Sequence, residues 1–247
     1  MPTDVEITNP KISVFVPVAP ARQDGVCSIC HNATTIGSWG THYPRCWNCR
    51  TLPAGGVRTI VPISLVHTSE SQLYASLRDY KSRGLAPSVK AEHALLLAAT
   101  LQRFLRHHRP HIEEEAGVAW DTIQVVPSSR PERRDHPLEA VIRRTRHRDE
   151  LEQLLTRTDE PIDHNEPNPA AFAPTDDVEG RRVLIVDDTF TTGARVQSVA
   201  AALTSAGATV VAAVPIGRVI DTDREEKAAF WRAQRAIPFD FGTCCLE

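Results

Sequence analysis

The chain has 247 residues, of which 41% are hydrophobic and 24% are charged, as in ordinary globular proteins. This length supports one main domain with a full hydrophobic core and a smaller accessory unit. With 28 basic and 31 acidic residues the net charge is −3, so no global field would draw the chain to nucleic acid or to a membrane. The first residues lack the basic and apolar regions of a signal peptide, and no apolar run could span a bilayer. We therefore expect a cytoplasmic protein with no membrane association.

Two Cys-x-x-Cys pairs near the N-terminus have the spacing of a metal site. Cys27 and Cys30 form the first pair, and Cys46 and Cys49 form the second, with fifteen residues between the pairs. Four thiolates at this spacing complete the tetrahedron that zinc prefers and leave no open coordination position. The pattern predicts a structural zinc ribbon. Two disulfides are the alternative, which a cytosolic location disfavours.

Other residues near the cysteines have weaker signals. We expect Arg45 and Arg50 to offset the negative charge of a four-thiolate site, and we expect His31 and His42 to lie on the surface. The two remaining cysteines, at 244–245, fit three interpretations: buried apolar residues, a tail docked on the ribbon, or a redox-sensitive pair. Burial is the interpretation we favour.

Hydrophobic periodicity predicts alternating strands and helices after the cysteine pairs. We expect strands over residues 57–66, 122–126, 183–186 and 208–215. We expect helices over residues 72–80, 86–106, 136–148, 194–203 and 223–235. Several prolines make residues 159–177 an open loop in this prediction.

The most informative segment covers residues 183–193. Four aliphatic residues predict a strand buried on both faces, and Asp187 and Asp188 follow at the carboxyl end, where open α/β sheets bind ligands. Ionised carboxylates accept strong hydrogen bonds from the vicinal hydroxyls of a ribose. A Thr-rich loop with one glycine then leads into a helix, and a helix N-terminus favours phosphate. Together these features predict a site for ribose 5-phosphate.

Other interpretations fit parts of this segment. A core strand, an acidic turn and a Thr-capped helix would explain each piece but not their combination. A phospho-acceptor receiver domain also begins with an aliphatic strand that ends in paired acids, but too few residues follow Asp188 for such a domain. Neither a P-loop motif nor a dinucleotide-binding glycine motif follows a strand.

Residues 183–193 resemble the phosphoribosyl pyrophosphate (PRPP) motif of the type I phosphoribosyltransferases. With the two cysteine pairs ahead of it, the chain resembles more narrowly the ComF-like phosphoribosyltransferases, a family named for a role in bacterial DNA uptake. Residues 77–84 resemble a Lys-containing turn of that family, residues 125–130 resemble its pyrophosphate loop, and residues 164–172 resemble its Asn and Ala-Phe signature. The chain departs from the family at residues 156–163, which are acidic and contain proline where the family has a basic run.

The resemblance implies an α/β fold of the type I phosphoribosyltransferase kind, with an open, mostly parallel sheet flanked by helices, over residues 57–247. An N-terminal arm and a small zinc ribbon with four cysteine ligands would occupy residues 1–56. The resemblance also implies that Asp187 and Asp188 are the catalytic residues, which hold the ribose hydroxyls. The PRPP-binding residues that it implies are Thr189, Phe190, Thr191, Thr192, Gly193, Ala194, Ser129, Arg130 and Lys81. Structural Zn²⁺ in the ribbon and Mg²⁺ bound with PRPP would be the cofactors.

Three functions fit the sequence. The first is Mg²⁺-dependent transfer of the phosphoribosyl group from PRPP to an unidentified acceptor, and the second is catalytically inactive sensing of PRPP or nucleotides. The third is a DNA-associated competence adaptor, in which the ribbon and the basic residues 130–148 contact single-stranded DNA. Near-neutral charge and the absence of aromatic residues from that basic stretch count against the third.

Two further expectations concern partners and motion. A competence or nucleotide-metabolism protein and a second copy of the chain, in a homodimer, are the candidate protein partners. Residues 143–172 are rich in charge and proline, so we predict that they form a mobile lid that closes over PRPP and excludes water.

Overall fold

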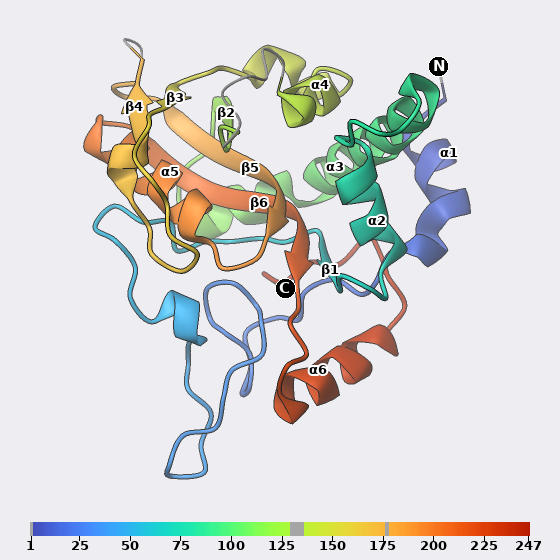
Figure 1. Cartoon of the computed structure of the whole chain (residues 1–247), viewed down its shortest axis with the longest axis vertical. Coiled ribbons are helices and arrows are strands. Elements are labelled where there is room, and N and C mark those ends of the chain that lie inside the picture. Colours follow the sequence, from blue (N-terminus) through green and yellow to red (C-terminus); the bar gives the residue numbers. More distant parts are fainter. Residues whose placement is uncertain (1, 129–135, 176–177) are drawn as a thin grey trace.

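The computed structural model describes residues 2–128, 136–175 and 178–247. Within these residues four parallel strands form the central sheet, in the order β1-β6-β5-β2 (Figure 1). Its strands are β1 (Ser64–Val66), β2 (Thr122–Val125), β5 (Arg182–Phe190) and β6 (Thr209–Val219). A separate antiparallel pair joins β3 (Leu155–Arg157) to β4 (Phe172–Pro174). The predicted α/β class with a parallel sheet is confirmed.

Helices lie on both faces of the central sheet (Figure 1). The α-helices are α1 (Asp4–Thr8), α2 (Gln72–Asp79), α3 (Pro87–Ala116), α4 (Pro137–Ile142), α5 (Ala194–Ser205) and α6 (Glu225–Arg235). The short 3-10 helices are η1 (Asn9–Val14), η2 (Trp47–Cys49), η3 (Arg146–Glu150) and η4 (Pro169–Ala171). None of the helices in the described part of the chain combines the length and apolar character needed to cross a bilayer.

The alternation of side chains along β5 divides the core into two layers. Leu184 and Val186 point into one cluster, which contains the buried residues of α2 and α3. Val183 and Ile185 point into the other, which contains the apolar face of α5 and the four N-terminal cysteines. Because both faces of the sheet are covered, residues 183–186 of β5 and most of β6 are apolar, as expected for buried parallel strands.

Several elements differ in extent from the prediction. The strand expected over residues 57–66 is regular only in β1, although Ile60 still forms a parallel bridge to Ala213. The helix expected over residues 136–148 ends at Ile142 and is followed by η3. The loop expected over residues 159–177 is shorter, because part of it folds into η4 and β4.

The long helix α3 continues ten residues beyond the predicted end at Arg106. Its last part is polar and buries few apolar side chains, so periodicity alone does not reveal it. The helix ends where Gly117 takes a left-handed backbone conformation, with a φ of 69°, and its N–H bonds to the carbonyl of Glu113. A glycine in this conformation is a common helix terminator.

Both ends of the described chain pack against the central domain. Phe15 stacks on Phe239 with ring centroids 4.8 Å apart and meets Phe241 edge-on at 5.7 Å. The hydroxyl of Ser64 in β1 donates to the carbonyl of Val16 at 3.0 Å. The N-terminal arm therefore shares the domain's core, and the boundary between residues 56 and 57 stays a prediction.

Candidate functional site

The carboxyl end of β5 opens into a cavity of about 480 Å³. The strand does not end at Val186 as predicted but continues through both carboxylates to Phe190, with Asp187 opposite Pro215 of β6. The cavity is lined by Lys81, Arg157, Ile162, Asp163, His164, Asp187, Asp188, Thr189, Phe190, Thr191, Thr192, Gly193, Ala194, Arg195 and Val196. The structure thus brings Lys81 together with the predicted residues of the 187–194 segment.

Asp188 is held from the turn that follows α2. The Lys81 ammonium lies 2.6 Å from Oδ2 of Asp188, and the hydroxyl of Tyr80 donates to the same oxygen at 2.5 Å. Burial raises the pKa of the Asp188 carboxyl, but the charge and hydrogen bond of Lys81 and the Tyr80 hydroxyl outweigh it, so the pKa lies below its ordinary value. Asp188 therefore stays an ionised acceptor at neutral pH.

Asp187 has the opposite electrostatic environment. Burial, together with the adjacent charge of Asp188, raises the pKa of Asp187 to about 7, while Arg195 and Lys81 act in the other direction. Its Oδ1 accepts a hydrogen bond from the backbone N–H of Asp188 at 3.0 Å. Two adjacent carboxyl groups with separated pKa values give the cavity one fixed negative charge and one that changes near neutral pH.

The loop between β5 and α5 requires a glycine at position 193. Gly193 has a φ of 88°, and a Cβ atom built there would lie 2.3 Å from the ring of Phe190. That ring is 1% exposed, so Phe190 supports the loop from the core. The turn brings the loop directly to the first residue of α5, Ala194. This arrangement of backbone N–H groups and helix N-terminus suits an anionic group.

The segment predicted as a lid forms one wall of the cavity. Arg157 in β3 donates to the carbonyls of Ala171 and Glu160, at 2.6 and 2.5 Å. The hydroxyl of Thr192 donates to the carbonyl of His164 at 2.5 Å, which joins this wall to the predicted phosphate loop. The β3–β4 pairing corrects part of the expectation of an open loop over residues 159–177. Closure over a ligand stays a prediction.

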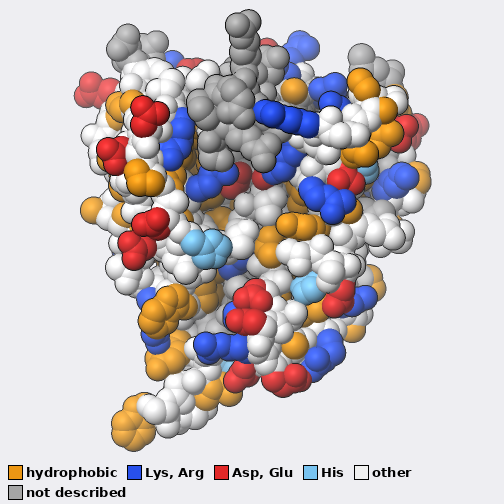
Figure 2. All heavy atoms as spheres, viewed as in Figure 1, with side chains coloured by type: hydrophobic (Ala, Val, Ile, Leu, Met, Phe, Trp, Pro, Cys, Tyr) orange, Lys and Arg blue, Asp and Glu red, His pale blue; other side chains and the backbone are white. Residues whose placement is uncertain are grey.

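Two residues in or near the cavity, Arg195 and His136, were not part of the predicted site. Arg195, in the first turn of α5, lines the cavity and donates to the carbonyl of Pro127 at 2.6 Å. Burial lowers the pKa of His136 to about 4, so its imidazole is neutral at neutral pH. The nearby charge of Asp188 raises this pKa and the charge of Lys81 lowers it. Arg195 is the second residue of α5, two positions after Gly193, and this closeness to the loop was the sequence signal that could have identified it. Lys and Arg side chains gather in the upper half of the face drawn in Figure 2, with carboxylates among them.

Ser129 and Arg130, predicted to bind pyrophosphate, lie outside the described residues. The preceding residues can be described. β2 lies beside β5, with Val125 opposite Val186, so the chain leaves β2 at the same edge of the sheet as Asp187. The carboxyl ends of neighbouring parallel strands converge there.

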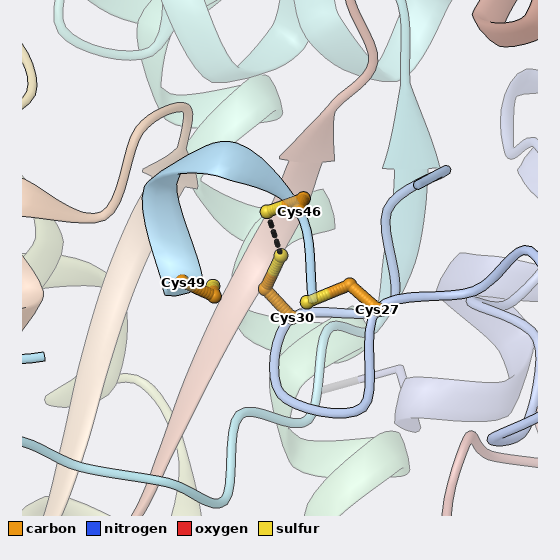
Figure 3. Close-up of side chains that lie close together, drawn as sticks. All are labelled: Cys27, Cys30, Cys46 and Cys49. Carbon is orange, nitrogen blue, oxygen red and sulfur yellow. Dashed lines mark hydrogen bonds between the residues drawn. The ribbon is translucent and has the colours of Figure 1, made fainter. Parts of the chain in front are cut away.

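The four N-terminal cysteines converge on one point (Figure 3). Their sulfur atoms lie within 4.8 Å of one another, and all four thiols are free and buried. The Sγ atoms of Cys30 and Cys46 are 3.6 Å apart, much farther than the roughly 2.05 Å of a disulfide. Two sulfurs of a tetrahedral zinc site, each about 2.3 Å from the ion, would be separated by about 3.8 Å. The cluster has the geometry of a zinc ribbon and could hold a zinc ion.

A buried arginine from β6 provides positive charge beside these thiols. Nη2 of Arg218 donates to Sγ of Cys30 at 3.4 Å, and Arg218 is 1% exposed. Hydrogen bonds with the other three thiols and the charge of Arg218 lower the pKa of Cys30. Arg45 and Arg50 were expected in this role, but Arg50 instead stacks on Tyr43 at 4.1 Å. The sequence signal that could have identified Arg218 was its charge within the otherwise apolar strand β6.

Of the two histidines that we expected on the surface near the ribbon, one is buried. His31, expected on the surface, is 1% exposed and its Nδ1 lies 2.9 Å from the carbonyl oxygen of Pro20. It has a positive φ of 56°, because it turns the chain immediately after Cys30. His42 is partly exposed. The predicted burial of both C-terminal cysteines, at 244–245, is confirmed.

Comparison with known proteins agrees with this geometry. Residues 121–242 match the family model described as the phosphoribosyl transferase domain. Residues 121–242 are therefore similar to a phosphoribosyltransferase domain. The matched region runs from the start of β2 past α6, so it includes both carboxylates and the loop before α5, whereas Lys81 and the ribbon cysteines precede it. The match supports membership of the phosphoribosyltransferase family. A search among curated proteins finds no match to the chain.

Proposed function

We propose that this protein binds PRPP with Mg²⁺ and transfers its phosphoribosyl group to an acceptor, as a ComF-like phosphoribosyltransferase. The observation that carries the proposal is the cavity at the end of β5, where two carboxylates and a glycine-containing loop at a helix N-terminus line one space. A ribose 5-phosphate presents two hydroxyl donors and an anion. The two hydroxyls match the carboxylates of Asp187 and Asp188, and the phosphate matches the loop at the N-terminus of α5.

In this proposal Asp187 and Asp188 accept hydrogen bonds from the ribose hydroxyls. Asp188 is held in place by Tyr80 and Lys81, so its position is fixed before the ligand arrives. Residues 189–193 bind the 5-phosphate through backbone N–H groups and Thr hydroxyls. Positioning of this kind lowers the barrier because the reacting atoms are already oriented when the ligand is bound.

The reaction is a substitution at the anomeric carbon of the ribose. The bond from that carbon to the pyrophosphate oxygen breaks, pyrophosphate leaves with the electron pair, and a nitrogen of the acceptor forms the new bond and loses its proton. Positive charge develops on the ribose ring, and the adjacent carboxylates would stabilise it. Lys81, whose side chain is 36% exposed at the cavity, would attract the leaving pyrophosphate.

The carboxylate oxygens of the cavity also fit Mg²⁺. This ion prefers hard oxygen ligands and usually binds through one or two carboxylates, substrate phosphates and water. When bound, it would neutralise charge on the pyrophosphate. Asp187 and Asp188 are the described residues that would hold it.

We also propose that Cys27, Cys30, Cys46 and Cys49 bind one structural zinc ion. Four thiolates leave no open position for a substrate, so the ion would act on stability and not on the reaction. Arg218 supports this assignment, since a guanidinium that donates to a thiolate offsets the net negative charge of such a centre.

The test is pyrophosphate release from PRPP and Mg²⁺ with a panel of nitrogenous acceptors, together with calorimetric binding of PRPP. The transferase proposal expects both signals, and it expects Asp188→Asn to weaken both. Asp149→Asn is the matched control, because its side chain is 87% exposed and does not line the cavity. PRPP binding without release on any acceptor would support the catalytically inactive sensor. No PRPP binding at millimolar concentration would refute both.

One observation favours the DNA-associated adaptor as a second candidate. A loop between the two cysteine pairs projects from the lower edge of the molecule in Figure 1. Trp39, between the pairs, is 91% exposed, and Trp47, in the second pair, is 76% exposed. Arg50 stacks beside Trp47, with its guanidinium carbon 5.4 Å from the ring. Aromatic rings next to a basic group are a platform for unpaired bases. Salt-dependent quenching of Trp fluorescence by single-stranded DNA would support this candidate, and unchanged fluorescence at low salt would exclude it.

A further inference from the structure

A second group of metal-ligating side chains lies outside the cavity and the ribbon. It consists of His108 and His111 from α3 and Cys244 and Glu247 from the tail that follows α6. One ligand atom from each of these four residues lies within 4.8 Å of the other three. His108 and His111 are three residues apart, so they share one face of the helix.

The distances within this group are close to those of a tetrahedral site. Nδ1 of His111 lies 2.9 Å from Oε1 of Glu247, and Nδ1 of His108 lies 3.7 Å from the same oxygen. The two imidazole Nδ1 atoms are 3.5 Å apart. Nitrogen and oxygen ligands about 2.0–2.2 Å from a zinc ion would be separated by about 3.3–3.6 Å. Small side-chain rotations would therefore make the group fit an ion.

The orientation of His108 is fixed as it is in metal-bound histidines. Its side chain is 1% exposed, and its Nε2 lies 2.9 Å from the backbone carbonyl oxygen of Phe241. A carbonyl can only accept, so Nε2 donates and Nδ1 of a neutral ring keeps a free lone pair toward the group. Metal-ligating histidines commonly donate their other ring N–H to a carbonyl in this way.

The charges also balance. A thiolate from Cys244 and a carboxylate from Glu247 together carry two negative charges, which equal the charge of one divalent ion. Two neutral imidazoles complete the set, so the centre would be neutral, and a neutral centre costs less to bury than an isolated ion. One sulfur, two nitrogens and one oxygen are donors that zinc accepts together.

We propose that His108, His111, Cys244 and Glu247 bind a second zinc ion, which fastens the C-terminal tail to α3. Cys244 and Cys245 then have separate roles, because Sγ of Cys245 faces the carbonyl of Ile60 at 4.0 Å. His108 and Cys244 are the buried half of the site, and Cys244 belongs to the same core cluster as the apolar side chains of α3. His111 and Glu247, with side chains 42% and 37% exposed, leave a path for the ion from solvent. This inference is independent of the proposed phosphoribosyl transfer.

The test measures zinc per chain in protein purified without chelator and then titrated with Zn²⁺. We expect a second equivalent in the wild type that is lost in His111→Gln and in Cys244→Ser. His107→Gln is the matched control, since it removes an exposed histidine from the adjacent position of the same helix. His111 is partly exposed, so its replacement leaves the core intact, and circular dichroism checks this for every variant.

Replacement of zinc by Co²⁺ identifies the donors. The wild type should gain a thiolate-to-cobalt absorption band that Cys244→Ser removes while the band of the four-cysteine centre remains. Equal zinc content and equal cobalt spectra in the wild type, His111→Gln and Cys244→Ser would overturn the proposal. In that case the group would be only an ion pair between His111 and Glu247 beside a buried thiol.

Discussion

The guanidinium of Arg218 joins Cys30 to the loop that follows β5. Nη2 donates to Sγ of Cys30 at 3.4 Å, while Nη1 donates to the carbonyls of Phe190 and Thr191 at 3.1 and 2.7 Å. The guanidinium carbon also lies 5.0 Å from the ring of Phe190. One buried cation therefore contacts both the cysteine cluster and the backbone of the proposed phosphate loop.

Arg218→Met should weaken both the cysteine cluster and the loop that follows β5. It leaves the thiolates without their buried cation and two loop carbonyls without a donor. Removal of one partner from a buried ion pair typically costs about 3–5 kcal/mol. We expect faster zinc loss to a chelator and weaker PRPP binding, although Arg218 does not line the cavity.

Chelator kinetics and calorimetry measure the two effects of Arg218→Met. Arg218→Lys should restore charge but only part of the loop contact, because an ammonium lacks the planar fork of donors. Arg148→Met, at a side chain 68% exposed, is the control for loss of an arginine in general. Normal PRPP affinity in a folded Arg218→Met protein would separate the loop from the ribbon.

The double variant Cys27→Ser and Cys46→Ser should lose the zinc of the ribbon. Each pair then has one thiolate left, which is too few for a tetrahedral site. Metal analysis by mass spectrometry measures the loss, and thermal unfolding should occur at a lower temperature because metal binding contributes to folding. Cys245→Ser replaces a buried cysteine outside both clusters and should keep its zinc. Unchanged zinc in the double variant would refute the ribbon assignment.

Gly193→Ala should disrupt the loop before α5. The new Cβ would lie 2.3 Å from the Phe190 ring, and the backbone φ of 88° is strained for alanine. Overpacking of this kind costs about 1–3 kcal/mol. Urea unfolding measures the cost, and PRPP binding should be lost with it.

The control for Gly193→Ala separates its two causes. Gly180 has a similar φ of 75°, but a Cβ there meets nothing within 4 Å. Gly180→Ala should therefore show only the backbone penalty, about 1 kcal/mol, and normal PRPP binding. Equal losses of stability in the two variants would mean that Phe190 moves aside without cost.

Stability should depend on pH through Asp187. Its pKa in the folded protein is raised to about 7 from an ordinary value of 3.8, so the folded state keeps a proton that the unfolded chain releases. The free energy of unfolding then falls as pH rises between these values, and the penalty is complete above about pH 7. Asp187→Asn cannot ionise, so it should stabilise the unliganded protein near pH 8 and have little effect near pH 4.

Urea unfolding of wild type and Asp187→Asn at several pH values checks this dependence. PRPP should show the opposite preference, because ribose hydroxyls need an acceptor: wild-type affinity should rise through about pH 7, and the rise should be smaller in Asp187→Asn. Parallel pH profiles of stability for the two proteins would show that Asp187 ionises normally in the cavity.

The sequence predicted the elements whose signals are local. The aliphatic run of β5, the 3.6-residue periodicity of α5 and the spacing of the cysteines each depend on neighbours within a few residues. The fold class and the position of Asp187 at the edge of the sheet followed from these signals. The role of Lys81 in binding PRPP was implied only by family resemblance, and its contact with Asp188, 107 positions away, was not predicted.

Features that depend on long-range packing were not predicted. The polar end of α3 is helical because it lies against the tail, where His108 meets Phe241. Residues 155–157 and 172–174 form a two-stranded sheet because β3 pairs with β4, although the composition of this region favours a loop. The charge of Arg218 in a buried strand is explained only by the cysteines from the other end of the chain, which the fold brings beside it. In each case tertiary contacts override local preference.

The contact between Arg218 and Cys30 also has a consequence for biosynthesis. The two residues are 188 positions apart, so the thiolates emerge from the ribosome well before the cation that offsets their charge. A contact of this separation forms late, after the closing of a long loop. In nascent chains that have not reached β6, a metal ion bound by the ribbon would be exposed, and Arg218 would not yet offset the charge of the thiolates. Stable capture of zinc would then mark chains whose central sheet is already complete.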